Sequence, residues 1–199
     1  MKKKVFNTVV ILVIVAVSLI GGLIYAGVAE KKRKKSYPVF FEASVASAAI
    51  RHEVPKNMVF AVLHARSEGN PSYEKDGKVG LYAMTEEQYL TLAGRVNESR
   101  DTRLRWSPEV SIEFCASELS EALGSFTDKS AAFASLYCGR EKVQKNITSH
   151  DGKFELSDLD EYTRSFVGKV LDALEAYNKL YPEEPADTAV LSSAAPSES

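Results

Sequence analysis

Apolar residues recur every three or four positions through most of the chain, which is the spacing of one face of an α-helix. Capping and turn-forming residues bound these stretches between residues 36 and 181. Residues 70–84 lack the helical period and are rich in turn formers, so we expect a loop there with at most a short strand pair. The fold class predicted is mainly α, with helices at about residues 38–53, 56–68, 85–94, 107–123, 128–138 and from 157 onward.

Three of these helices have clear start signals. Ser107 is a capping residue followed by a first-turn proline and an acid, which the helix dipole favours. Thr85 and Gln88 have the spacing of a capping box. We expect Ser157 to cap the last helix, whose predicted apolar stripe consists of Leu159, Tyr162, Phe166, Val170, Leu174 and Tyr177.

An uncharged segment near the start of the chain has the length of a membrane span. Thr8–Val28 contains no charged residue, and lysines and arginines flank it on both sides. We therefore predict an uncleaved single-pass anchor within residues 1–35; a cleaved signal peptide is the alternative. From residue 182 onward the composition turns to Pro, Glu, Ala and Ser, so residues 182–199 are predicted to be a disordered tail.

The charges are segregated along the chain. Of the 25 Lys and Arg, eight lie in the first 35 residues, together with one of the 27 Asp and Glu, so residues 36–199 carry 17 basic and 26 acidic side chains. Such an acidic body argues against nucleic acid as a partner. The three histidines and two cysteines lack metal-ligand spacing, so we predict no metal and no cofactor. Cys115 and Cys138 would form one disulfide in an oxidising compartment, or remain two separate thiols.

Five short segments in a fixed order carry a family resemblance. They are residues 61–71 (AVLHARSEGNP), 80–86 (GLYAMTE), 108–115 (PEVSIEFC), 135–139 (SLYCG) and 162–170 (YTRSFVGKV). Together they resemble the lytic transglycosylases of the SLT type, which are relatives of goose-type lysozyme. The resemblance implies a lysozyme-like SLT domain over residues 36–181. It also implies cleavage of the MurNAc–GlcNAc bond of peptidoglycan with release of an anhydro sugar.

The first segment departs from the family at its chemical position. The family motif A-I-I-x-x-E-S-G-F-N-P aligns without gaps with residues 61–71, so Arg66 stands where the family has its catalytic glutamate. That glutamate donates a proton to the glycosidic oxygen and later accepts one. A guanidinium has no acceptor lone pair and stays protonated, so it cannot do this. We predict a degenerate domain, a pseudoenzyme, with Glu68 as the fallback acid if the helix end unwinds.

The former active-site groove is the predicted ligand site. Its candidate residues are Arg66 and Ser67 on the helix end, and Tyr82, Tyr137 and Tyr162 from the later motifs. Arg66 would offer a fixed cation to the lactyl or peptide carboxylates of muropeptides. The tyrosines would stack on sugars, or lie buried in the core.

Three hypotheses follow for the function. The first is an anchored domain of the bacterial cell envelope, attached through residues 8–28, that binds peptidoglycan strands or an envelope protein without cutting. The second is an active lytic transglycosylase that uses Glu68. The third is a structural docking module of an envelope complex. The resemblance places the domain on the extracytoplasmic side, although the five basic residues after the span favour the cytoplasmic side.

Overall fold

The computed structural model describes residues 27, 28, 30–95 and 99–183, and the chain divides into two compact units after Pro38. In the first unit, residues 30–36 are helical. Except for Gly27 and Val28, the predicted membrane segment lies outside the described residues. Within the described ranges, no helix is long and apolar enough to cross a membrane.

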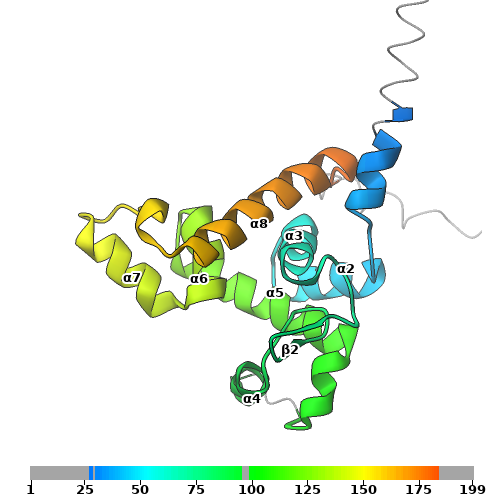
Figure 1. Cartoon of the computed structure of the whole chain (residues 1–199), viewed down its shortest axis with the longest axis horizontal. Coiled ribbons are helices and arrows are strands. Elements are labelled where there is room, and N and C mark those ends of the chain that lie inside the picture. The colour runs from blue at the N-terminus through cyan, green and yellow to red at the C-terminus, as the bar shows by residue number, and fades with distance from the viewer. Residues whose placement is uncertain (1–26, 29, 96–98, 184–199) are drawn as a thin grey trace, which may run out of the picture. The chain divides into compact units, whose positions relative to one another are not determined.

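The second unit is mainly helical, as predicted, with one small two-stranded sheet. Its elements, shown in Figure 1, are α2 (Glu42–Arg51), α3 (Lys56–Ser67), β1 (Glu74–Lys75), β2 (Lys78–Val79), α4 (Glu86–Arg95), the 3₁₀ helix η1 (Thr102–Trp106), α5 (Pro108–Ser125), α6 (Lys129–Cys138), α7 (Arg140–Ser149), the 3₁₀ helix η2 (Leu156–Asp158) and α8 (Glu161–Leu180).

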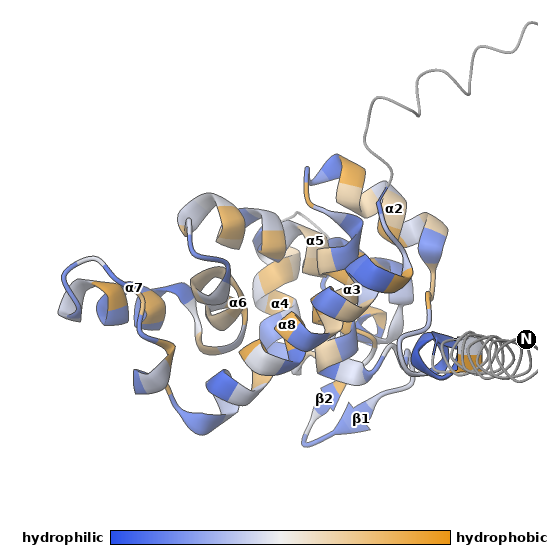
Figure 2. Ribbon diagram, turned by 90° about the horizontal axis from the view of Figure 1, so that it is seen from above, coloured by the Kyte–Doolittle hydropathy of each residue, from blue (hydrophilic) through white to orange (hydrophobic). Residues whose placement is uncertain are grey.

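Helix α3 forms the centre of the core. It packs along α8 and also contacts α2 and α5, and hydrophobic residues gather along α3, α5 and α6 in Figure 2. Val59, Val62 and Leu63 are fully buried, as the apolar pattern predicts. The Phe60 ring stacks on Tyr177 of α8, with 5.3 Å between the ring centroids. Because α3 is enclosed, its last turn is held at a defined place in the domain.

The boundary signals of α4 and α5 are confirmed. The Ser107 hydroxyl accepts a hydrogen bond from the Val110 N–H at 3.3 Å. Thr85 and Gln88 form the reciprocal capping box, because each backbone N–H donates to the side chain of the other residue at 3.0 and 3.2 Å.

The last helix starts later than predicted, and a helix before it was missed. Asp160, not Ser157, caps α8 by accepting from the Thr163 N–H, while Ser157 lies in η2. Tyr162 is therefore not part of the buried stripe: it is 75% exposed, and Thr163 points inward instead. Helix α7 was not predicted because it buries only Val143 and Asn146, which do not form a repeating apolar pattern.

The predicted strand pair is a hairpin whose tip is Asp76–Gly77. Both tip residues have positive φ, 52° and 75°, as a two-residue turn between right-twisted strands requires. At position 80 only glycine fits, because φ is 77° and a Cβ would collide with the backbone oxygen of Arg105. The loop after the hairpin is thus packed closely against η1.

The predicted tail begins too early. Glu183 Oε1 accepts a hydrogen bond from the Asn57 N–H at 2.8 Å, and the Asn57 side chain donates to the Tyr181 carbonyl at 2.9 Å. These bonds satisfy an otherwise unpaired donor in the first turn of α3. The chain through Glu183 therefore belongs to the fold, and residues 184–199 lie outside the described residues.

Candidate functional site

Arg66 ties the end of α3 to the end of α6. Its Nη2 donates to the backbone oxygen of Leu136 at 2.7 Å. Leu136 lies in the last turn of α6, where carbonyl oxygens lack helical partners and a cation is favoured by the helix dipole. The guanidinium carbon also lies 4.1 Å from the centroid of the Tyr82 ring and 5.4 Å from that of Phe166. Arg66 is therefore a structural cation as well as a candidate binding residue.

The Ser67 side chain lies inside the fold. It is buried, and its hydroxyl lies 2.7 Å from the Leu81 carbonyl oxygen and 3.2 Å from that of Leu63. Ser67 lines neither of the two cavities described below, so its predicted role in substrate binding stays a prediction. Its role is to fasten the loop after the hairpin to α3, which positions Tyr82 against Arg66.

Glu68 caps α3 in a left-handed conformation with φ of 56°. The family motif has glycine at this position, and glycine adopts positive φ without steric cost. The Glu68 side chain is exposed and lines neither of the two cavities described below. Burial lowers the pKa of the His64 imidazole, and the negative charge of Glu68 partly opposes this shift.

A cavity of about 260 Å³ lies on one side of Arg66. We call it the acidic cleft because its lining includes the carboxylates of Glu87 and Glu118, together with Arg95 and Tyr82. The Tyr82 hydroxyl donates to Glu118 at 3.0 Å, and Arg95 Nη1 lies 3.6 Å from the other oxygen of that carboxylate. Glu118 is not among the residues predicted from the sequence, since an acid within a helix gives no signal that separates a cleft from a solvent-facing position.

Tyr82 is buried, so of the two alternatives predicted for the tyrosines it fits burial in the core and not stacking on a sugar. Burial raises the pKa of its phenol well above the ordinary value; the positive charge of Arg66 lowers it, and the carboxylate of Glu118 raises it. Tyr82 therefore stays a neutral hydrogen-bond donor, and it joins Arg66 to Glu118 across the floor of the acidic cleft.

A second cavity, of about 210 Å³, lies on the other side of Arg66 and shares Tyr137 with the first. We call it the cationic groove because its lining contains Arg66, Lys78 and Lys169 and no acid. Tyr137 is 37% exposed and stacks on Phe166, with 5.1 Å between centroids. The exposed Tyr162 also lines this groove, so two of the three predicted tyrosines offer accessible aromatic surface.

The cysteines are two separate thiols, which was one of the two alternatives. Cys115 is fully buried, and burial raises the pKa of its thiol. Cys138 is partly exposed, and its sulfur lies near the Gly139 carbonyl oxygen.

Comparison with known proteins assigns this arrangement to a family. The family model of the transglycosylase SLT domain matches residues 43–158, more than half of the chain. A comparison with curated protein sequences finds no match.

Two solved structures share the fold. The 70 kDa soluble lytic transglycosylase from Escherichia coli has a TM-score of 0.69 at 17% identity over 77% of this chain. An inactive glutamate-to-glutamine mutant of lytic transglycosylase Slt from Pseudomonas aeruginosa has a TM-score of 0.60 at 19% identity over 75% of this chain. The match spans about a quarter of each of those proteins (26%).

Proposed function

Because this chain belongs to the transglycosylase SLT domain family, we propose that it binds glycan strands of peptidoglycan across Arg66 and Tyr137 without cleaving them. The observation that carries the proposal is the state of Arg66. The family motif puts a proton-donating glutamate at this position, and here a guanidinium is held against the Leu136 carbonyl. The Pseudomonas mutant, inactive after loss of one glutamate carboxyl, illustrates the dependence of that enzyme on such a group.

We infer that the carboxylates near Arg66 do not replace the missing acid. A general acid must lie within hydrogen-bonding reach of the leaving oxygen. Glu118 accepts from the Tyr82 hydroxyl, and Glu87 projects from the exposed first turn of α4. Glu68 lies outside both cavities. This arrangement favours a binding role over the active-enzyme alternative.

Two accessible tyrosines support the glycan as the ligand. Tyr137 and Tyr162 are exposed large aromatic side chains that line the same groove. Exposed apolar groups that lie together in this way are typical of ligand-binding grooves. The predicted membrane anchor and the extracytoplasmic location of the domain remain part of the proposal, because they place it where peptidoglycan is found.

Sedimentation with insoluble peptidoglycan tests the proposal. The full chain, purified with detergent present, should be retained in the pellet, and soluble anhydro-muropeptides should not accumulate. Tyr162→Ala should weaken retention about fivefold, the scale of one lost aromatic contact. Leu171→Ala is the matched control, because Leu171 is also exposed on α8 but lines neither cavity.

Three results would change the assignment. If the wild-type chain stays in the supernatant, the glycan-binding proposal fails and the docking-module hypothesis remains. Release of anhydro-muropeptides would support the active-enzyme hypothesis, and loss of that release in Glu68→Gln or Glu118→Gln would identify the acid. Equal retention of the two α8 variants would move the glycan site away from the cationic groove.

A further inference from the structure

We propose that the cationic groove selects glycans that carry carboxylates, with Lys78 and Lys169 as the residues that recognise the acid. This inference rests on the glycan binding proposed above and adds the feature of the glycan that is recognised. Peptidoglycan offers such groups in two places, on the lactyl ether of muramic acid and on the stem peptide. The shared chemistry is a carboxylate beside a sugar ring.

The cations of the groove are among those that the fold leaves without acidic partners, and they differ from the others in lining one cavity together. Within the described part of the chain, no carboxylate oxygen lies within 4.0 Å of the charged nitrogens of Arg66, Lys78 or Lys169. Several cations elsewhere in the second unit do have such partners, namely Arg51, Arg95, Arg103, Arg105, Arg140, Lys142 and Lys145. The buried Nε of Arg66 also lacks a hydrogen-bond partner among the described residues. Three adjacent cations without counter-ions form a site for an anion.

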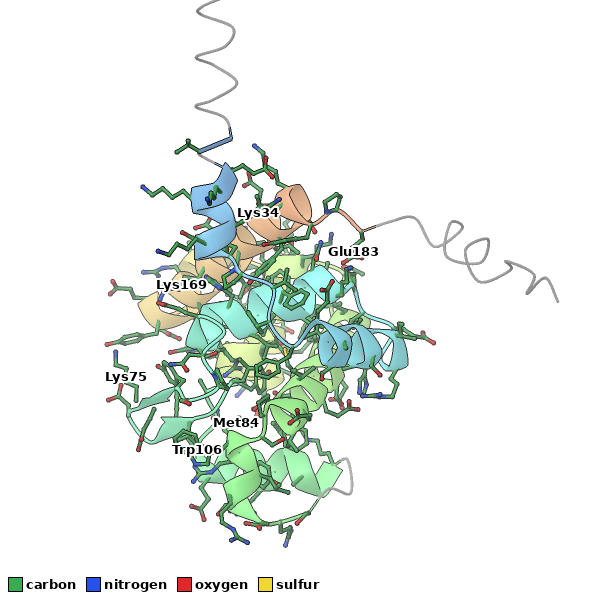
Figure 3. All side chains as sticks on the ribbon, turned by 90° about the vertical axis from the view of Figure 1, so that its right-hand side faces the viewer. Lys34, Lys75, Met84, Trp106, Lys169 and Glu183 are labelled. Atoms are coloured by element: carbon green, nitrogen blue, oxygen red, sulfur yellow. The ribbon has the colours of Figure 1, made fainter. Side chains whose placement is uncertain are left out.

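The hairpin adds a second observation. Lys75 and Lys78 are paired directly across β1 and β2, so their side chains lie on the same face of the hairpin. Like charges in such a pair destabilise a hairpin. Figure 3 shows Lys75 and Lys169 on the same side of the domain. An anion bound between the hairpin and α8 would relieve this repulsion.

The geometry couples the charge to a sugar-binding surface. The Lys78 ammonium lies 5.5 Å from the centroid of the Tyr137 ring, and Tyr137 borders both cavities. A sugar packed on Tyr137 would therefore present a substituent to Lys78. The exposed Tyr162 and Lys169 complete the far wall. Arg66 forms the base, since Leu136 and Tyr82 already hold its position.

The surrounding charge makes this groove selective. Residues 36–199 carry 26 acidic and 17 basic side chains, so the net charge of this part of the chain does not by itself attract an acidic ligand. Acidic glycans are then directed to the cationic groove, which is lined by cations and no acid. The acidic cleft, by contrast, has the carboxylates of Glu87 and Glu118 beside its two arginines, Arg66 and Arg95.

Binding of three defined oligosaccharides to the full chain tests the inference. The ligands are a neutral tetramer of N-acetylglucosamine, a peptide-free tetrasaccharide with free lactyl carboxylates, and the same tetrasaccharide with its stem peptides. We expect at least one acidic ligand to bind about tenfold more tightly than the neutral tetramer, and this preference to shrink in 0.5 M salt, because screening weakens exposed charge pairs.

A double substitution assigns the preference to the lysines. Lys78→Met with Lys169→Met should abolish the tenfold preference, measured as the ratio of the variant's affinities for the acidic ligand and for the neutral tetramer. Lys153→Met with Lys179→Met is the control, since it removes two exposed positive charges from positions outside the groove. We expect both variants to fold, because none of these four lysines has an ion-pair partner among the described residues. Melting followed by circular dichroism checks this.

Each outcome has a distinct meaning. Preference for the peptide-free tetrasaccharide identifies the lactyl carboxylate, and preference only for the peptide-bearing one identifies the stem. Equal binding of neutral and acidic ligands, or a preference that survives loss of Lys78 and Lys169, overturns this inference and leaves the proposed function standing. If none of the three ligands binds, the proposed function itself fails.

Discussion

The two cavities beside Arg66 share Arg66 and Tyr137 in their linings but differ in whether their charged side chains have ion-pair partners. In the acidic cleft, Glu118 is bonded to Tyr82 and lies beside Arg95, and Arg95 also lies 3.7 Å from Glu121. In the cationic groove, Lys78 and Lys169 have no acidic partner within the described ranges. The charges of Glu118 and Arg95 are therefore satisfied by the fold, whereas those of Lys78 and Lys169 are left available to a ligand.

This difference separates stability from binding. Removing a group from the paired set leaves its buried partners unsatisfied, which costs folding free energy. Removing an exposed, unpaired lysine costs the fold little and takes away a ligand contact. Arg66 belongs to both cavities, so its substitution is the strongest test of the distinction.

Arg66→Met should lower the free energy of unfolding by about 2–3 kcal/mol, because it removes a charge-assisted hydrogen bond and a cation–π contact from a partly buried position. The methionine keeps much of the side-chain volume. Urea unfolding followed by circular dichroism measures the change. A loss below about 0.5 kcal/mol, the range of ordinary surface substitutions, would show that the guanidinium does not tie α3 to α6.

Tyr82→Phe should cost about 1–2 kcal/mol at pH 7, because it deletes the hydroxyl that donates to Glu118 and retains the ring beneath Arg66. The pKa of Tyr82 is raised by burial, so the wild-type chain loses stability as pH rises through the ordinary tyrosine pKa of about 10.

Phenylalanine does not ionise, so the stability gap between the two proteins should narrow above about pH 10. Urea unfolding of both proteins at neutral and alkaline pH measures it. A gap of constant size would mean that Tyr82 titrates alike in the folded and unfolded states, and the floor of the acidic cleft would then be open to water.

Glu68→Gly should stabilise the domain by about 0.5–1 kcal/mol, because glycine accepts the positive φ at the helix end that glutamate adopts with strain. Peptidoglycan retention should not change, since Glu68 lines neither cavity. Thermal melting and sedimentation together provide the readout. Weaker retention with unchanged melting would place Glu68 at the ligand and reverse its assignment as a capping residue.

Local signals account for much of what the sequence predicts. The capping box at Thr85 and the cap at Ser107 are contacts between near neighbours, and both form as expected. The last helix was placed too early because Ser157 and Asp160 are both good capping residues, and only the fold decides between them. Helix α7 was missed since it follows Gly139, which provides no side-chain cap.

The site depends on contacts that no local pattern contains. The family motif located Arg66, but its bond to Leu136 joins residues 70 positions apart. Glu118 and Lys169 enter the two cavities from α5 and α8, where each is one charged residue among many on a helix. The burial of Ser67 and its bond to the Leu81 carbonyl likewise depend on the fold and are not contained in the residue type.

Mass spectrometry of peptidoglycan incubated with the full chain tests the central claim most directly. We predict that anhydro-muropeptides stay at the level found with heat-denatured protein, while the chain remains bound to the insoluble fraction. Time-dependent release of anhydro-muropeptides by the wild-type chain, lost in Glu118→Gln or Glu68→Gln, would contradict the claim that this groove binds without cutting.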